Sequence, residues 1–308
     1  MNKRNFGVAA VIVSAICFGF VPMFMQYLKS MGATTLSAAF CRFFLSLLPM
    51  YCYLKIKKVP MAVTAKQFGK ICLITVAGYG GTSLLLFFSY NYIPTGMATT
   101  LHFCYPAMVI VFSIVFLRER VKLFKLLSVA MCLVGMFMFY DGGANISLMG
   151  IFLAFASGNT YAFYILYLDK SELKNMHSLK LIVYMNTLGT LLTGAVALSM
   201  GEMSLSFPVS GWIFASVFAV CVSFIAVLGF QLGVKYTGAQ SAAILSTLEP
   251  ITSVMVGVVI YGERFSVKGI IGCVLILAAT VIVAVKQDED EPDQLQEKKK
   301  PRSDDKAS

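Results

Sequence analysis

FCYPAMVIVFSIVFLRER occupies residues 103–120, and TLEPITSVMVGVVIYGER occupies residues 247–264. The second stretch lies 144 residues after the first, and each is an apolar run with a proline near its start and Glu-Arg at its end. A pattern repeated at so long a fixed spacing indicates a chain built from two copies of one structural unit.

The composition is that of a membrane protein. The 308 residues are 58% hydrophobic and 13% charged, whereas soluble domains are about 45–50% apolar and about 25% charged. The net charge of +10 does not indicate nucleic acid binding, which needs Lys and Arg gathered on one solvated face. Here the basic residues lie in short gaps between apolar runs, so we expect a lipid bilayer, and no nucleic acid, as a partner.

Ten apolar runs have the length of about 20 residues that a helix needs to cross about 30 Å of hydrocarbon. They cover residues 6–28, 34–54, 68–90, 95–117, 122–140, 148–168, 178–200, 211–234, 239–261 and 266–285. The first follows the basic MNKRN but is longer than a signal peptide's core of up to about 15 residues, with no small-residue cleavage site, so we expect it to be retained. The sequence predicts an all-α integral membrane protein with ten transmembrane helices.

The basic residues orient these helices. Lys and Arg collect in cytoplasmic loops, and with the N-terminus inside, the inner gaps hold 15 Lys and Arg whereas the outer gaps hold 3. Both termini are therefore expected in the cytoplasm. Residues 286–308 are charged and poor in apolar side chains, which predicts a disordered cytoplasmic tail.

The repeat divides the ten runs into two halves, residues 1–144 and 145–285. A shift of 144 residues superposes these pairs: Tyr92 and Tyr236, Ala98 and Ala242, Pro106 and Pro250, Glu119 and Glu263. Because each half holds five spans, an odd number, the second half enters the membrane inverted. Inverted repeats are typical of secondary transporters, which bind substrate near the midplane between the repeats. A duplicated bundle without transport is the alternative.

Three motifs carry a family resemblance: the proline and closing Glu-Arg in each half, Arg42 within AAFCRFFLSLLP, and Glu249-Pro250. Together they resemble the drug/metabolite transporter superfamily, EamA type, over about residues 6–285. The resemblance implies transport of small metabolites such as amino acids across the bacterial inner membrane, often outward. It also implies a central cavity lined largely by spans 1, 3, 4, 6, 8 and 9.

Three ionisable residues inside the predicted spans are candidates for function, because such groups are costly in hydrocarbon. Glu249 precedes Pro250, which frees a backbone carbonyl one turn back, so that it could bind an ammonium group or a proton. Arg42 keeps its charge and either pairs within the protein or binds a substrate carboxylate. His102 could respond to protons or be a neutral structural histidine.

Polar and aromatic residues at helical spacing complete the predicted transport pathway. They are Ser14, Phe18, Gln26, Tyr79, Tyr105, Asn159, Tyr161, Gln231 and Ser246. Tyr105 occupies the repeat position of Glu249, which would make the cavity charged on one side and aromatic on the other. Glu119 and Glu263 are expected to be interfacial anchors or contacts between the halves.

The remaining motifs favour no catalytic, metal or cofactor site. The eight cysteines include no CxxC pair and no Cys/His ligand spacing, and AGYGGTS at 77–83 lacks the Lys-Ser/Thr ending of a P-loop. An intramembrane enzyme and a regulatory bundle are the competing hypotheses. The favoured one is a secondary carrier of a small metabolite, with a homodimer as a further option.

Overall fold

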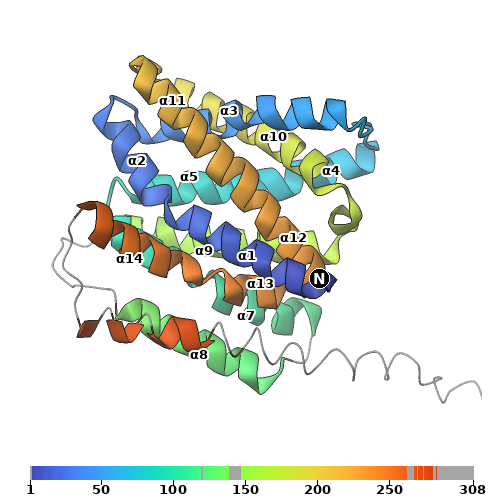
Figure 1. The fold of residues 1–308 in the computed structure, drawn as a ribbon, viewed down its shortest axis with the longest axis vertical. Helices are drawn as coiled ribbons and strands as arrows, with labels where there is room; N and C mark the ends of the chain where they lie inside the picture. The colour runs from blue at the N-terminus through green and yellow to red at the C-terminus, as the bar shows by residue number, and fades with distance from the viewer. Residues whose placement is uncertain are drawn as a thin grey trace, which may run out of the picture.

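The computed structural model describes residues 2–93, 95–118, 121–138, 147–261, 267–268, 270–272, 274–279 and 282. These residues form a bundle of helices without a strand (Figure 1). Glu119, Glu263, the tail at 286–308 and much of the last predicted span at 266–285 lie outside the described residues.

The described residues of the first half of the chain form nine helical elements. They are α1 (Lys3–Gly19), α2 (Val21–Ser30), α3 (Thr35–Ile56), α4 (Ala65–Leu73), the π-helix η1 (Ile74–Tyr79), α5 (Gly80–Ser89), α6 (Thr95–His102), α7 (Tyr105–Leu117) and α8 (Leu123–Phe137). The second half contributes eight more that the structure describes. They are α9 (Leu148–Lys170), the short 3-10 helix η2 (Glu172–Asn175), α10 (Ser178–Ser199), α11 (Val209–Phe218), the π-helix η3 (Ala219–Ala226), α12 (Val227–Thr237), α13 (Ala239–Leu245) and α14 (Leu248–Tyr261).

Six continuous helical stretches in the described part of the chain are long and apolar enough to cross a membrane. They run over Lys3–Ser30, Thr35–Ile56, Ala65–Ser89, Leu148–Lys170, Ser178–Ser199 and Val209–Thr237. Shorter apolar helices cover Tyr105–Leu117, Leu123–Gly135 and Ile270–Ala279. The predicted all-α membrane class is confirmed.

Two of the predicted spans are broken in the middle. The span predicted at 95–117 is divided at Phe103 and Cys104 into α6 and α7, and the span predicted at 239–261 is divided at Ser246 and Thr247 into α13 and α14. Each second segment has a proline, Pro106 or Pro250, in its first turn, where a missing N–H breaks no helical hydrogen bond.

Three other spans depart from a regular α-helix. The first predicted span is divided at Phe20, two residues before Pro22, into α1 and α2. The third and eighth contain the π-helical turns η1 and η3, which widen the helix. These π-helices fall at corresponding places in the two halves, because η1 begins at residue 74 and η3 at residue 219.

Close helix packing at glycines joins the halves. α1 packs along α12, α3 along α10, and α5 along α9. In the α1–α12 interface a Cβ on Gly229 would lie 2.6 Å from the Ala10 carbonyl oxygen, and one on Gly233 would clash with Val11. Small residues that let helix backbones approach are typical of membrane bundles.

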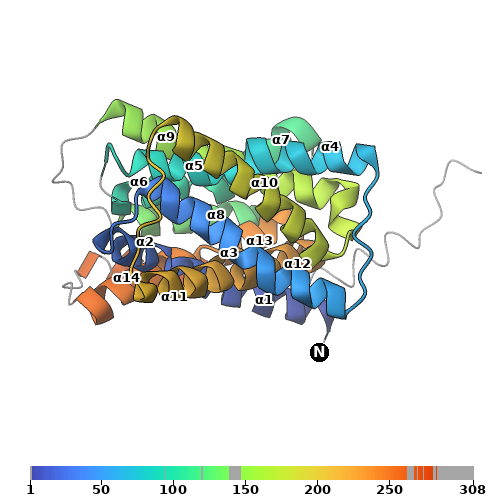
Figure 2. The same ribbon diagram turned by 90° about the horizontal axis from the view of Figure 1, so that it is seen from above.

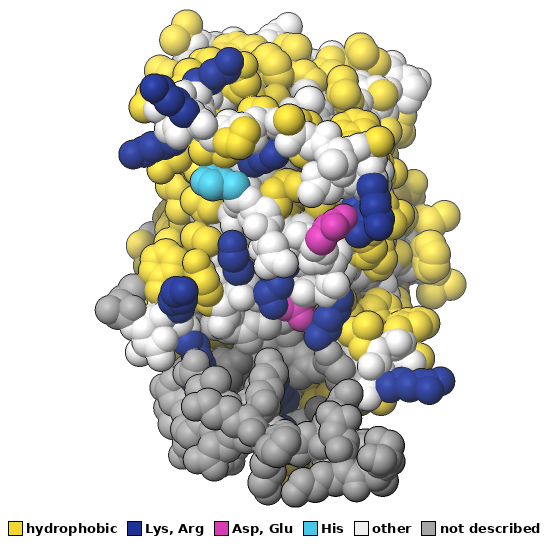
Figure 3. All heavy atoms as spheres, turned by 90° about the vertical axis from the view of Figure 1, so that its right-hand side faces the viewer, with side chains coloured by type: hydrophobic (Ala, Val, Ile, Leu, Met, Phe, Trp, Pro, Cys, Tyr) yellow, Lys and Arg dark blue, Asp and Glu magenta, His cyan; other side chains and the backbone are white. Residues whose placement is uncertain are grey.

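The outer surface divides into an apolar belt and a basic end. Side chains such as Leu48, Leu148 and Val209 are 72%, 82% and 77% exposed, which a bundle surrounded by lipid tolerates and a bundle in water does not. The helices run roughly along the horizontal of Figures 1 and 2, so the bundle has a left and a right end. Figure 3 looks onto the right-hand end, where Lys and Arg side chains gather.

We expect Gly229→Ala to destabilise the protein, because the added methyl group meets the α1 backbone rather than a side chain that could turn aside. The cost should be about 1–3 kcal/mol, as for other overpacked cores, and should lower the midpoint of thermal unfolding in detergent. Gly69→Ala on exposed α4 is the matched control, because no heavy atom lies within 4 Å of its Cβ position. An equal midpoint for both variants would contradict the α1–α12 packing.

Candidate functional site

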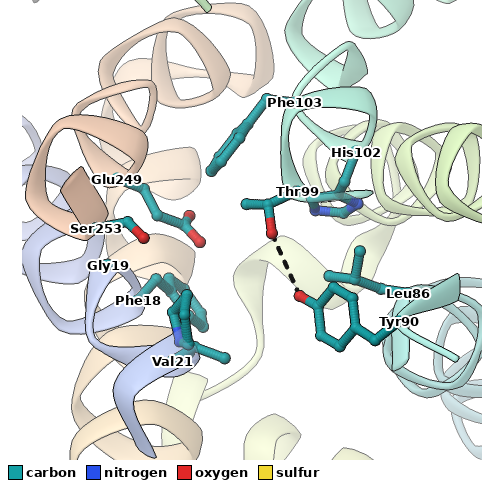
Figure 4. Close-up of a pocket in the computed structure, with 11 residues that line it drawn as sticks. Phe18, Gly19, Val21, Leu86, Tyr90, Thr99, His102, Phe103, Glu249 and Ser253 are labelled. Atoms are coloured by element: carbon teal, nitrogen blue, oxygen red, sulfur yellow. Dashed lines mark hydrogen bonds between the residues drawn. The ribbon is translucent and has the colours of Figure 1, made fainter. Parts of the chain in front are cut away.

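A small cavity of about 30 Å³ lies between α1, α2, α5, α6 and α14 (Figure 4). Its lining is formed by Phe18, Gly19, Val21, Pro22, Leu86, Tyr90, Thr99, His102, Phe103, Glu249 and Ser253. Both helix breaks contribute to it, since His102 and Phe103 adjoin the first break and Glu249 follows the second. The volume holds one or two waters but not a metabolite, because pockets for small organic ligands measure about 300–1,000 Å³.

Glu249 is the carboxylate of this cavity. It lies in the first turn of α14, and its backbone N–H donates to the Ser246 carbonyl oxygen at 3.0 Å. Figure 4 shows its carboxylate and the Ser253 hydroxyl facing Thr99 and Tyr90 across the gap. Glu249 forms no ion pair within 4.0 Å with any Lys, Arg or His nitrogen that the structure describes. A cationic group entering the cavity would therefore meet an uncommitted acceptor, which the positive end of the α14 helix dipole also stabilises.

His102 lies on the opposite wall of the cavity and is held by its neighbours. Its Nδ1 is 2.9 Å from the Ser157 Oγ, and that hydroxyl also donates to the Ala154 carbonyl oxygen at 2.6 Å. The ring packs between Tyr105 and Tyr161, with both ring centroids 5.5 Å away. The side chain is fixed in orientation, and within the described part of the chain one ring nitrogen, Nδ1, has a hydrogen-bond partner.

Tyr105 makes the polar contact that joins the two helix breaks. Its hydroxyl is 2.5 Å from the Ser246 Oγ, which donates in turn to the Ala243 carbonyl oxygen at 3.0 Å. Next to it, Cys132 on α8 contacts the Thr247 hydroxyl at 3.3 Å. The break between α13 and α14 is thus held by side chains of α7 and α8.

A column of aromatic rings leads from the cavity towards Arg42. Tyr161 stacks on Tyr164 with centroids 5.6 Å apart, and Tyr164 lies 5.8 Å from Tyr79. The Arg42 Cζ lies 4.7 Å from the Phe43 ring centroid and 6.0 Å from that of Tyr79. Arg42 donates from Nη2 to the Ser83 Oγ at 2.9 Å and is 6% exposed.

The structure brings most of the predicted pathway residues together. Phe18, His102 and Glu249 line the cavity, and Tyr79, Tyr105, Tyr161, Arg42 and Ser246 belong to the connected interior just described. Gln231 joins it through a 3.4 Å contact from Nε2 to the Tyr164 hydroxyl.

Three predicted residues lie apart from this connected interior. Ser14 is fully buried on α1, and its Oγ has no hydrogen-bond partner among the residues described. Gln26 is exposed on α2. Asn159 donates back to the Phe155 carbonyl oxygen of its own helix at 2.9 Å.

Sequence reasoning did not single out Tyr90, Thr99, Ser157, Tyr164 or Ser253. Helical spacing could have found four of them. Tyr164 and Ser157 lie one turn from Tyr161, Thr99 lies one turn from His102, and Ser253 lies one turn after Glu249. Tyr90 needed the packing of other helices.

A second hollow, of about 670 Å³, opens at the basic end. Lys57, Lys58, Glu172, His177 and Lys180 are among its lining residues. The Lys70 ammonium, which donates to the Glu172 Oε1 at 2.8 Å, holds the pKa of that carboxyl below its usual value. In the described part of the chain no three His, Cys, Asp or Glu side chains gather as metal ligands would.

Comparison with known proteins gives one consistent family. The model of the EamA-like transporter family matches the chain twice, over residues 5–140 and 148–285. A protein of Archaeoglobus fulgidus named "uncharacterized transporter" is 28% identical over 282 residues, covering 90% of this chain and 96% of its own length. The "uncharacterized transporter YcbK" of Bacillus subtilis is 25% identical over 279 residues, covering 87% and 89%. One crystal structure shares the fold with a TM-score of 0.77 at 15% identity, covering 94% of this chain and 99% of its own.

We expect Tyr105→Phe to lower stability by about 1 kcal/mol, because it removes a buried hydrogen bond and leaves the ring in place. The measurement is the thermal unfolding midpoint of the purified protein. Tyr27→Phe is the control, since that ring is 44% exposed and its hydroxyl forms no hydrogen bond with the residues that the structure describes. A smaller loss for Tyr105→Phe than for Tyr27→Phe would contradict the contact with Ser246.

Proposed function

Because the chain belongs to the EamA-like transporter family of the drug/metabolite transporter superfamily, we propose that it carries a small amino-acid-like metabolite by alternating access. Family and relatives are membrane transporters and not enzymes. The observation that carries the proposal is the cavity at Glu249, together with the unequal packing of repeat-related residues around it.

The proposed architecture is two inverted repeats of five helices, residues 1–144 and 145–285. It is supported by the family model, which matches each half separately, and by the recurrence of the helix breaks and of the π-helices η1 and η3. We place the basic end in Figure 3 in the cytoplasm of a bacterial inner membrane, with both termini on that side, because cytoplasmic loops are rich in Lys and Arg.

The two halves are in different conformations around the cavity. The shift of 144 residues relates Tyr105 to Glu249 and His102 to Ser246. Tyr105 and Ser246 are hydrogen-bonded, whereas the related pair, Glu249 and His102, lines a cavity. The helices follow the same pattern. α7 packs against α13, whereas the cavity lies between α14, which is the counterpart of α7, and α6, which is the counterpart of α13.

Exchange of the two conformations would open one site to each side in turn. In the exchanged state the Tyr105–Ser246 contact separates and Glu249 closes onto His102, while α7 and α13 part at the basic end. The cavity in the present state lies towards the opposite end, near α2 and α14 (Figure 1). Transport by this exchange needs only a gradient, which agrees with a sequence that contains no P-loop.

The lining favours a solute with a cationic amine and an apolar or aromatic part. Glu249 supplies the charge, Ser253 and Thr99 supply hydroxyl groups, and Phe18, Tyr90 and Phe103 supply ring faces. Ammonium groups bind both to carboxylates and to aromatic faces. Amino acids and their amines have this combination, and export from the cytoplasm is the direction that the family resemblance implies.

We expect Glu249→Gln to abolish exchange of labelled solute in proteoliposomes, because the amide has no charge to hold an ammonium group and cannot carry a proton. The exchange rate is measured as counterflow of a labelled amino acid that is chemically unmodified. Asn159→Ala is the control that should keep wild-type flux, since among the described residues the Asn159 side chain bonds to the Phe155 carbonyl oxygen of its own helix. Wild-type flux in Glu249→Gln would contradict the assignment of Glu249, and a bundle without transport would show no saturable flux with any solute.

The conformational exchange predicts opposite movements at the two ends of spans 4 and 9. Spin labels at Tyr92 and Ile260 report the end near the cavity, and labels at Phe116 and Gln240 report the basic end. When a transported solute is added, the first distance should shorten and the second should lengthen by several ångströms. Double electron–electron resonance on a variant without native cysteines measures both pairs, and changes of the same sign would contradict the exchange.

A further inference from the structure

The hollow of about 670 Å³ at the basic end is not used by the proposed function. It lies where one apolar span ends and another begins. Lys57 and Lys58 directly follow α3, whereas His177 directly precedes α10 and Lys180 lies in its first turn. Its volume falls within the range of about 300–1,000 Å³ that sites for small organic ligands have. The hollow is therefore large enough for a ligand, unlike the cavity at Glu249.

The lining of the hollow carries positive charge that is not neutralised. Lys57, Lys58 and Lys180 line it, and none of them forms an ion pair with an acidic side chain in the described part of the chain. The one carboxylate among its lining residues, Glu172, is paired with Lys70, whose Nζ lies 2.8 Å from its Oε1. Lysine side chains of this kind bind phosphate groups as point charges, so the lining favours an anion of that type.

The first turn of α10 adds to this preference. The helix has 22 residues, and the side chain of its N-cap residue, His177, forms no capping hydrogen bond. The first N–H groups of a helix and the positive end of its dipole both favour a negative ligand. The backbone and the lysines of the hollow therefore favour ligands of the same charge.

Lys58 has a backbone conformation that glycine usually supplies. Its φ is 52°, and it directly follows the C-cap residue of α3, Lys57, at the position where helices commonly end with a glycine. The Val59 N–H, which donates to the Leu54 carbonyl oxygen at 3.0 Å, closes this helix end. A lysine is less stable than a glycine in the left-handed region, and its presence is explained if the ammonium group has a ligand.

The surroundings of the hollow are those of the membrane interface. The ends of two apolar spans, α3 and α10, meet there, which is the depth where hydrocarbon gives way to lipid headgroups. Ile56 beside Lys57 is 77% exposed, and Tyr53 one turn earlier is 43% exposed. The Lys57 Nζ lies 6.0 Å from the Tyr53 ring centroid, and such tyrosines are typical of the interface. An anion in the hollow thus has exposed apolar surface beside it.

The two sides of the hollow are held together by the protein itself. The Lys180 Nζ donates to the Ala62 carbonyl oxygen at 2.6 Å, and the Tyr184 hydroxyl donates to the Met61 carbonyl oxygen at 2.6 Å. These bonds fix the segment between α3 and α4 against α10. The hollow is therefore preformed, and a ligand that binds there loses little affinity to the ordering of the protein.

We propose that this hollow binds the phosphate group of an anionic membrane lipid, whose acyl chains lie against Tyr53 and Ile56. Basic pockets between membrane helices bind lipid headgroups in this way. Lys57, Lys58 and Lys180 hold the phosphate oxygens, and a zwitterionic lipid is disfavoured because its ammonium group meets the same lysines. The site needs a bilayer but no transport, so the proposal stands apart from the proposed function.

The test is lipid binding by the full-length protein in neutral detergent. Dioleoyl phosphatidylglycerol is added in increasing mole fraction, and the thermal unfolding midpoint gives an apparent affinity. The midpoint should rise saturably. Two comparisons define the ligand: phosphatidylcholine with the same chains lacks the net charge, and glycerol phosphate lacks the chains. Neither should raise the midpoint at the same concentration.

Two variants assign the binding to the hollow. Lys57→Gln and Lys58→Gly should each weaken phosphatidylglycerol binding about five-fold, because each removes one cation from the lining. Without lipid, Lys58→Gly should unfold at a midpoint no lower than wild type, because glycine adopts the left-handed conformation without strain. Its loss of binding is then not a folding defect. Lys3→Gln is the matched control, since it removes the same charge at the same end of the bundle without lining the hollow (Figure 1).

Three results would overturn the site. Phosphatidylcholine that stabilises the protein as much as phosphatidylglycerol would show that charge is not recognised. Glycerol phosphate that is equally effective would identify a site for soluble anions instead of lipids. A loss of binding in Lys3→Gln as large as in Lys57→Gln would show an effect of the overall charge of this end and not of the hollow. Because no flux is measured, each of these results leaves the experiment on Glu249 unaffected.

Discussion

Hydrocarbon offers the backbone no hydrogen-bond partner, and this constraint governs where the chain can depart from a regular helix. A lipid-exposed break would leave N–H and C=O groups unpaired at a cost of several kcal/mol each. In this protein the breaks at Phe103–Cys104 and Ser246–Thr247 and the π-helices η1 and η3 are covered by other helices. Buried side chains of the neighbouring helices, such as Tyr105 and Asn186, bond to the chain there. The irregular backbone and the polar interior are therefore one feature of the fold.

The same constraint explains why the polar residues are few and connected. A charged group inside the bundle is costly unless it is paired or bound, and Glu249 and Arg42 are placed where aromatic and hydroxyl side chains surround them. Glycines bring the helices close enough for these contacts. The carbonyl oxygen of His102, for example, would lie 2.7 Å from a Cβ on Gly158, so α9 can approach the break after α6 only because that side chain is absent.

The sequence predicted the apolar spans well, because their length follows from bilayer thickness, and six of them are continuous helical stretches in the structure. It predicted less of their irregularity. The two breaks were not predicted, although Pro106 and Pro250 lie in the first turn after each of them, and no residue pattern indicates the π-turns, which arise from packing. Helical spacing placed Phe18 and Tyr161 correctly near the interior, yet it could not tell which way Gln26 or Asn159 faces, since that depends on the rotation of each helix against its neighbours. The shift of 144 residues also relates Arg42 to Asn186 and Tyr79 to Ser223, and all four of these polar side chains are buried.

The differences between the repeats bear on how a carrier of this kind could release its solute. If the halves were identical in sequence, their two conformations would have equal free energy, and a ligand with equal affinity for both would shift neither. Here one half places Tyr105 against Ser246, and the other places Glu249 opposite His102. In the proposed exchange, Glu249 is open to a cationic solute in one state and contacts His102 in the other. A solute bound to Glu249 must leave before this contact can close, so that release on the second side follows from the closing contact itself. The first repeat has His102 and Tyr105 where the second has Ser246 and Glu249. This difference would give the two faces of one site different affinities for the solute, which a symmetric duplication lacks.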